Sequence, residues 1–115
     1  MVRTAGPIVV GVKEHQPWVL DRAKAEAERA GRPLRLVHAF TVPPTLVGVA
    51  FLDVPAAMRA TSEQLLESAS QRLREGGRTV PIERAVVRGA PGWVLEQESK
   101  HAELLVIGPD DAKHW

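Results

Sequence analysis

Two short apolar runs, one near each end of the chain, constrain the fold more than any other feature. The runs Ile8 to Val12 and Leu104 to Gly108 are rich in branched residues, are too short for helices, and each leads into a turn. Such runs are typical of buried strands in parallel sheets, which place their ligands where the strands end. The second run continues as Pro-Asp-Asp over residues 109–111, where a phosphate-holding loop would need glycines and open N–H groups. The sequence therefore indicates a nucleotide-binding scaffold more firmly than a working nucleotide site.

Strands and helices are predicted to alternate along the whole chain. Apolar spacing and the positions of glycine and proline predict strands over residues 7–12, 34–40, 80–87 and 104–107, and helices over residues 16–30, 55–75 and 92–101. This alternation predicts a single α/β domain over residues 1–115, with an open parallel sheet covered by helices on both faces. The connection over residues 41–54 is long and apolar, which favours a mobile lid or a partner contact. After the strand at 104–107 too few residues remain for another helix and strand, so we expect four strands.

Composition excludes several classes of function. Lys and Arg total 15 against 14 Asp and Glu, a net charge of +1, and the charges alternate along the chain. This pattern argues against nucleic acid or an anionic membrane as the main partner. The chain has no cysteine, which excludes disulfides and thiolate chemistry. With neither a signal-peptide pattern nor a membrane-length apolar run, we expect a cytoplasmic protein.

Four stretches of sequence resemble the universal stress protein family, in the order in which that family has them. They are Ile8-Val9-Val10-Gly11-Val12, Leu36-Val37-His38-Ala39, the run from Val86 to Leu95 (Val-Val-Arg-Gly-Ala-Pro-Gly-Trp-Val-Leu), and the run from Glu103 to Gly108 (Glu-Leu-Leu-Val-Ile-Gly). The resemblance implies a Rossmann-like or flavodoxin-like fold of the adenine-nucleotide alpha-hydrolase type, with strand order 3-2-1-4-5, and frequent homodimers. For this chain we expect the order 3-2-1-4, with the fifth strand missing.

The resemblance also implies where a nucleotide site would lie. The family's nucleotide-site positions correspond here to Gly11, Val12, Lys13, Ala39, Gly108 and Asp111. Nucleotide-binding members end the first strand with an acidic residue that contacts adenosine, whereas this chain has Lys13, which can only donate hydrogen bonds. Those members follow the fourth strand with a Gly-x-x-Gly motif, of which this chain keeps Gly108 but has Asp111 in place of the second glycine. We therefore expect ATP to bind weakly or not at all, and we expect no cofactor.

Other residues allow a chemical and a structural interpretation. Lys13, Glu14 and His15 could bind a phosphate or transfer a proton, or they could form a solvated loop. His38 is predicted to be a satisfied core histidine in preference to a ligand. A divalent-cation site would need the carboxylates and imidazole near the chain end, which are more simply solvated; these are Asp110, Asp111 and His114. We expect Trp93 to be a packing residue and Trp115 to be either frayed or an interface anchor.

These observations favour a stress-response regulatory or interaction protein with a degenerate nucleotide site. The alternative is an ATP-binding protein in which Lys13 meets the phosphates and a partner chain completes the loop. An enzyme, such as a nucleotide hydrolase, is not expected, because no catalytic motif is present. The strand at 104–107 is apolar on both faces and would be a sheet edge, so we expect a homodimer or another protein to pair with it.

Overall fold

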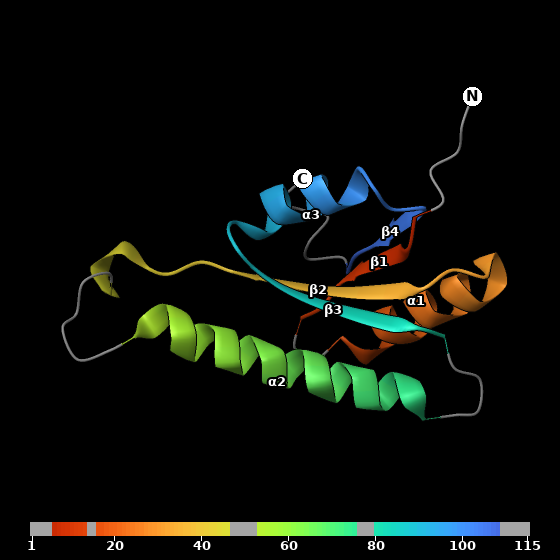
Figure 1. Cartoon of the computed structure of the whole chain (residues 1–115), viewed down its shortest axis with the longest axis horizontal. Helices are drawn as coiled ribbons and strands as arrows, with labels where there is room; N and C mark the ends of the chain where they lie inside the picture. Colours follow the sequence, from red (N-terminus) through yellow and green to blue (C-terminus); the bar gives the residue numbers. More distant parts are fainter. Residues whose placement is uncertain (1–5, 14–15, 47–52, 76–79, 109–115) are drawn as a thin grey trace.

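The computed structural model describes residues 6–13, 16–46, 53–75 and 80–108. Its four strands are β1 (Ile8–Gly11), β2 (Leu34–Phe40), β3 (Ile82–Arg88) and β4 (Leu104–Val106). They form one parallel sheet in the order β3-β2-β1-β4 (Figure 1). The predicted fold class and strand order are therefore confirmed.

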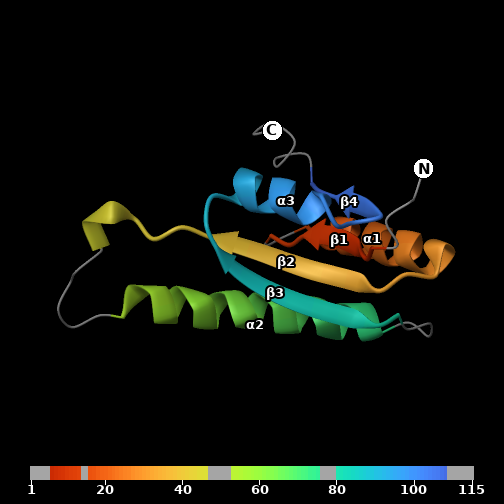
Figure 2. The same cartoon turned by 45° about the horizontal axis from the view of Figure 1, so that its top comes forward.

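In the described part of the chain three α-helices cover the sheet, and they divide between its two faces. They are α1 (Pro17–Ala30), α2 (Val54–Arg74) and α3 (Pro91–Ser99), and a short 3-10 helix, η1 (Pro44–Leu46), follows β2. Helices α1 and α2 lie on one face of the sheet and α3 lies on the other (Figures 1 and 2). One buried cluster joins α1 and α2 to the first face, and a second joins α3 to the other. This division follows from the right-handed crossovers: β1 to β2 and β2 to β3 step in one direction across the sheet, and β3 to β4 steps back.

The central strand explains why the sequence needs an unbroken apolar run. Along β1, Ile8 and Val10 face α1 and α2, whereas Val9 faces α3, and all three are at most 1% exposed. A strand buried on both faces cannot alternate apolar with polar residues. Burial of each of these side chains contributes roughly 1.5–3 kcal/mol.

The helix ends follow local signals. Helix α1 ends at Gly31, whose φ of +65° is a left-handed conformation that glycine adopts without a Cβ clash. Helix α2 begins after Asp53, whose side chain accepts a hydrogen bond from the Ala56 N–H at 3.1 Å. With 21 residues α2 is about 31 Å long, whereas a strand of seven residues spans about 23 Å. Its first turns therefore extend beyond the sheet, beside η1 (Figure 2).

The observed boundaries differ slightly from those expected. Strand β3 begins at Ile82, two residues later than predicted, and α3 begins at Pro91, with the proline in its first turn. The connection over residues 41–54 contains η1, and its residues 47–52 lie outside the described part of the chain. No helix within the described ranges is both long and apolar enough to span a membrane.

An ion-pair network fastens α3 to the sheet. Arg35 on β2 donates from Nε to Glu98 Oε2 at 2.9 Å and from Nη2 to Glu98 Oε1 at 3.3 Å, and its Nη1 lies 3.4 Å from Glu83 Oε2 on β3. The hydrogen bonds to Glu98, with a smaller effect of Glu83, raise the pKa of Arg35 above its ordinary value. Arg35 therefore stays charged and bridges three elements.

Candidate functional site

The carboxyl edge of the sheet gathers the site positions that the sequence implied. Gly11 and Val12 are buried at the end of β1, followed by the half-buried Lys13, and Ala39 lies near the end of β2. Gly108 lies buried just after β4. Parallel strands all end at one edge, which is why residues far apart in sequence meet there. Asp111 lies outside the described residues, as do Glu14, His15, Asp110, His114 and Trp115.

Described residues at this edge line a hollow toward α3 and another toward α2. The α3-side hollow has a volume of about 40 Å³ and is lined by Gly11, Val12, Lys13, Val37, His38, Ala39, Pro91 and Leu95. The α2-side hollow has a volume of about 340 Å³ and is lined by Lys13, His38, Thr61, Ser62 and Leu65. Lys13 and His38 line both hollows, so these two side chains lie at the centre of the candidate site.

His38 is held by the main chain of the neighbouring strand. Its Nδ1 lies 2.9 Å from the carbonyl oxygen of Val12. A carbonyl can only accept, so Nδ1 carries a proton and donates, and Nε2 is the ring atom that can meet a ligand. The ring is satisfied on one side, as expected of a core histidine. A core histidine would be buried, however, and that part of the expectation is wrong: His38 lies near the carboxyl end of β2 and is partly exposed.

Two glycines of the site allow close approaches. A Cβ at Gly11 would lie 3.2 Å from both terminal methyl groups of Leu95, so α3 packs directly on β1 there. A Cβ at Gly108 would lie 2.4 Å from Oε1 of Gln16, the residue before α1. That Gln16 oxygen is buried and has no hydrogen-bond partner within the described part of the chain. Sequence reasoning missed Gln16, because only the folded chain brings it against Gly108.

Thr61 and Ser62 were also missed, although the sequence holds a signal for one of them. Ser62 stands four residues after Met58 and four before Leu66, on the face of α2 that also buries Leu66 and Leu73, and it is 3% exposed. Its hydroxyl donates to the Met58 carbonyl at 2.8 Å, and the Thr61 hydroxyl donates to Ala57 at 3.1 Å. A polar residue on an apolar helix face can mark either such a bond or a site. Here the residue lines a hollow as well.

The expectation that Trp93 is a packing residue holds only in part. The ring atoms of Trp93 would lie 3.6 Å or more from a Cβ at Gly89, so one edge of the indole packs there. The residue is nevertheless 58% exposed, because it lies near the start of α3 with no helix above it among the described residues. Trp18, near the start of α1, is 57% exposed.

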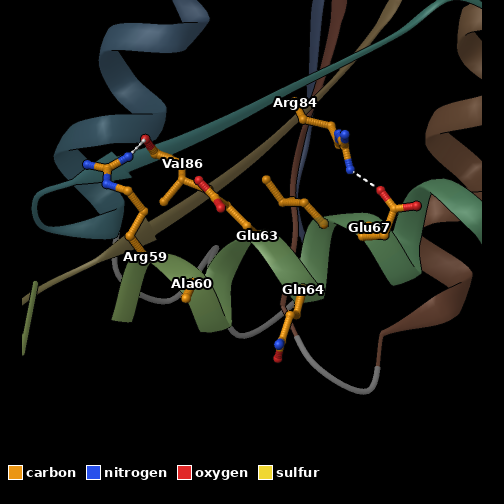
Figure 3. Close-up of a pocket in the computed structure, with 8 residues that line it drawn as sticks. Arg59, Ala60, Glu63, Gln64, Glu67, Arg84 and Val86 are labelled. Carbon is orange, nitrogen blue, oxygen red and sulfur yellow. Dashed lines mark hydrogen bonds and ion pairs between the residues drawn. The ribbon is translucent and has the colours of Figure 1, made fainter. Parts of the chain in front are cut away.

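A larger hollow, of about 600 Å³, lies away from this edge, between α2 and β3 (Figure 3). Figure 3 shows Arg84 of β3 paired with Glu67 of α2, and Arg59 reaching from α2 to the main chain of β3. The Arg59 Nη1 donates to the Val86 carbonyl oxygen at 3.2 Å, and its guanidinium lies 5.7 Å from the centre of the Phe40 ring. Among the described residues, no three potential metal ligands cluster here or elsewhere.

Together, the parallel sheet and the crevice at its carboxyl edge define a small α/β domain of the Rossmann-like class. A model of the universal stress protein family matches residues 5–113. The chain therefore belongs to the universal stress protein family. A search of curated proteins gives no significant match.

Solved structures of the same family share the fold. A universal stress protein in complex with cAMP is 26% identical over 90% of this chain and 77% of its own, with a TM-score of 0.64. A family protein from Burkholderia pseudomallei is 21% identical over 99% of this chain and 89% of its own, with a TM-score of 0.74. UspA from Lactobacillus plantarum is 18% identical over 94% of this chain and 79% of its own, with a TM-score of 0.65.

Proposed function

We propose that this chain is a non-enzymatic regulatory or interaction module of the universal stress protein family, with a site that does not hold ATP in the family's manner. The observation that carries the proposal is the size of the α3-side hollow. Its volume of about 40 Å³ compares with about 300–1,000 Å³ for small-molecule sites. An adenine ring would need more room than that.

Packing and charge at the same place support this proposal. Leu95 lies against Gly11, so widening the α3-side hollow would require α3 to move away from β1. Lys13 stands where nucleotide-binding members have an acid, so an acceptor for adenosine hydroxyls is replaced by a donor. Both features disfavour binding of the adenosine part of ATP.

The interaction part of the proposal rests on β4. Within the described residues this strand is one edge of the sheet, and its three residues are all apolar. Leu104 is 41% exposed there. An apolar edge without charged side chains is a template for pairing with another chain. We propose a second copy of this chain, or another protein, as its partner.

Equilibrium binding of a fluorescent ATP analogue, with and without magnesium, tests the nucleotide part. We expect a dissociation constant weaker than about 10 μM, which corresponds to roughly 7 kcal/mol. The variant Lys13→Asp restores the acid of nucleotide-binding members. It should bind the ATP analogue at least as tightly as the wild type does. Wild-type binding tighter than that limit would overturn the proposal.

One observation favours a second candidate function, the binding of cAMP. The solved family member that is 26% identical to this chain is in complex with cAMP. A cyclic monophosphate carries a single negative charge and needs no triphosphate cradle, and Lys13 could meet that charge. Displacement of a fluorescent cAMP analogue by cAMP, but not by ATP, would select this candidate. If neither cAMP nor ATP displaced the analogue, the proposed function would remain that of an interaction module.

A further inference from the structure

We propose that the hollow between α2 and β3 binds an extended segment of another protein, which adds as a strand beside β3 and places a lysine or arginine against Glu63. This hollow has a volume of about 600 Å³ and lies between one side of α2 and the outer side of β3 (Figure 3). Strand β3 is at the opposite edge of the sheet from β4. The surface is therefore distinct from the interface proposed above, and it adds a second partner to the function.

Strand β3 offers main-chain groups for such a partner. The Leu34 N–H donates to the Pro81 carbonyl, and in this register the odd-numbered residues of β3 bond to β2. The even-numbered residues, Arg84 and Val86 among them, therefore direct their N–H and C=O groups away from the sheet. Within the described residues no strand pairs with this side of β3. An extended segment placed there forms ladder hydrogen bonds, which is how many peptides bind to exposed sheet edges.

Helix α2 supplies the wall beside this edge. Arg59, Glu63 and Glu67 are spaced four residues apart and lie on the side of α2 that faces β3 (Figure 3). Four residues of a helix rise about 6 Å, and alternate side chains of a strand are about 6.6–6.8 Å apart. The side chains that an added strand directs toward α2 therefore meet these three residues in turn.

The charges of the lining favour a cationic side chain opposite Glu63. Glu67 is paired with Arg84, and Arg59 donates to the Val86 carbonyl. Glu63 is exposed and makes no hydrogen bond or ion pair with another described residue. Its carboxylate is thus available to accept a charge-assisted hydrogen bond from a partner's lysine or arginine. An acidic side chain at the same position would meet like charge.

Arg59 makes the surface selective. It occupies the Val86 carbonyl, so a strand that pairs along the whole edge displaces it. The loss of that hydrogen bond disfavours an arbitrary strand, and an ion pair at Glu63 offsets the loss. A segment with a basic residue facing α2 is therefore favoured over the same segment with an acidic residue.

Titration with two heptapeptides, followed by nuclear magnetic resonance, tests the proposal. The probe is acetyl-Thr-Val-Thr-Lys-Thr-Val-Thr-amide, which reads the same in both directions and so tests parallel and antiparallel pairing together. The second peptide has glutamate in place of lysine. We expect the lysine peptide to bind with a dissociation constant of about 1 mM or tighter, and the glutamate peptide to bind at least about threefold more weakly. Glu63→Lys should reverse this preference.

The control is Glu96→Lys, at an exposed glutamate of α3 on the other face of the sheet. This variant should keep the wild-type preference for the lysine peptide. The same change of preference in Glu96→Lys and Glu63→Lys would show a general effect of charge and overturn the proposal. Equal binding of both peptides by the wild type, or binding of neither, would also overturn it.

Amide resonances of the wild type locate the bound peptide, and this measurement decides the matter should a variant fail to fold. The Arg84 and Val86 amide protons should shift downfield, because each gains a hydrogen-bond acceptor from the added strand. Shifts confined to β4 would overturn the proposal. Shifts at β3 on dilution of the protein alone, with none on addition of peptide, would assign this edge to a second copy of the chain and overturn it too.

A variant of the other edge separates this surface from the interface proposed above. Leu104→Lys places a charge in β4, at a residue that is 41% exposed. It should bind the lysine peptide as the wild type does, whether or not β4 mediates self-association. Loss of peptide binding in Leu104→Lys would place the peptide at β4 and overturn the proposal.

Discussion

At the scale of single residues, glycines mark where this small fold is tightest. Gly6, just before β1, is buried, and a Cβ there would lie 1.8 Å from the His101 main-chain oxygen. A Cβ at Gly108 would meet the end of the Gln16 side chain instead. The two contacts differ in kind, because a backbone oxygen is fixed by the turn between α3 and β4, whereas a glutamine amide can rotate away.

We therefore predict that Gly6→Ala destabilises the protein far more than Gly108→Ala. Overpacking against fixed backbone costs about 1–3 kcal/mol, and Gly6→Ala should lie at or above the upper end of that range. Gly108→Ala should cost less than about 1 kcal/mol, since Gln16 can move. Urea unfolding followed by circular dichroism measures both free energies. Equal losses of unfolding free energy in the two variants would contradict the prediction, because they would show that contact with fixed backbone at residue 6 carries no extra cost.

At the scale of elements, the two edges of the sheet differ in the charged side chains that lie beside them. Leu34 N–H donates to Pro81 and Gly89 N–H donates to Phe40, so the odd-numbered residues of β3 bond to β2. The even-numbered residues from Ile82 to Arg88 therefore direct their main-chain groups outward. Arg59 occupies one of these groups, the Val86 carbonyl, near the middle of the edge. Charged side chains near an edge discourage pairing with another chain, and β4 has none.

We predict that Arg59→Ala increases self-association through β3. The change removes the hydrogen bond to Val86 and the contact with the Phe40 ring, and exposes a main-chain acceptor. Sedimentation velocity should show a larger fraction of species above the wild-type mass. Arg22→Ala, which removes an exposed arginine from α1, should behave as the wild type. An Arg59→Ala profile matching that control would contradict the protective role of Arg59.

At the scale of the whole molecule, the sheet is covered unevenly. Helices α1 and α2 cover one face, while α3, with nine residues, covers the other, and β4 has three residues. Leu104 leaves an apolar surface at β4, and we propose that a partner covers it. A domain of this size gains stability by burying such a surface.

We predict that the wild-type protein self-associates at micromolar concentration through β4. Leu104→Lys should weaken the dimer at least about tenfold, because it places a charge in the paired edge. Residue 104 is 41% exposed, so the folding stability of the monomer should change little. Ala25→Lys, at an exposed apolar residue of α1, is the control. A wild-type protein that sediments as a monomer would remove the homodimer from the proposal.

The sequence by itself determined the elements, their order and the residues that reach the carboxyl edge of the sheet. Apolar-rich runs of four to eight residues, the glycine after α1 and the proline at the start of α3 carry that information locally, within a few residues of each element. The end of β1 could be placed at the crevice for the same reason, because strands of a parallel sheet end at a common edge. The family resemblance then gave the strand order, which the structure confirms.

The tertiary structure alone decided which side chains share a space. Thr61 and Ser62 lie more than 20 residues from His38 and join it only because α2 packs across the end of β2. The small volume of the hollow beside Gly11 depends on how closely Leu95 approaches. The hydrogen bond at the edge of β3 forms because Arg59 reaches the Val86 carbonyl from α2. Such contacts are set by packing between elements at distances of a few ångströms, and a pattern read along one chain holds no measure of those distances.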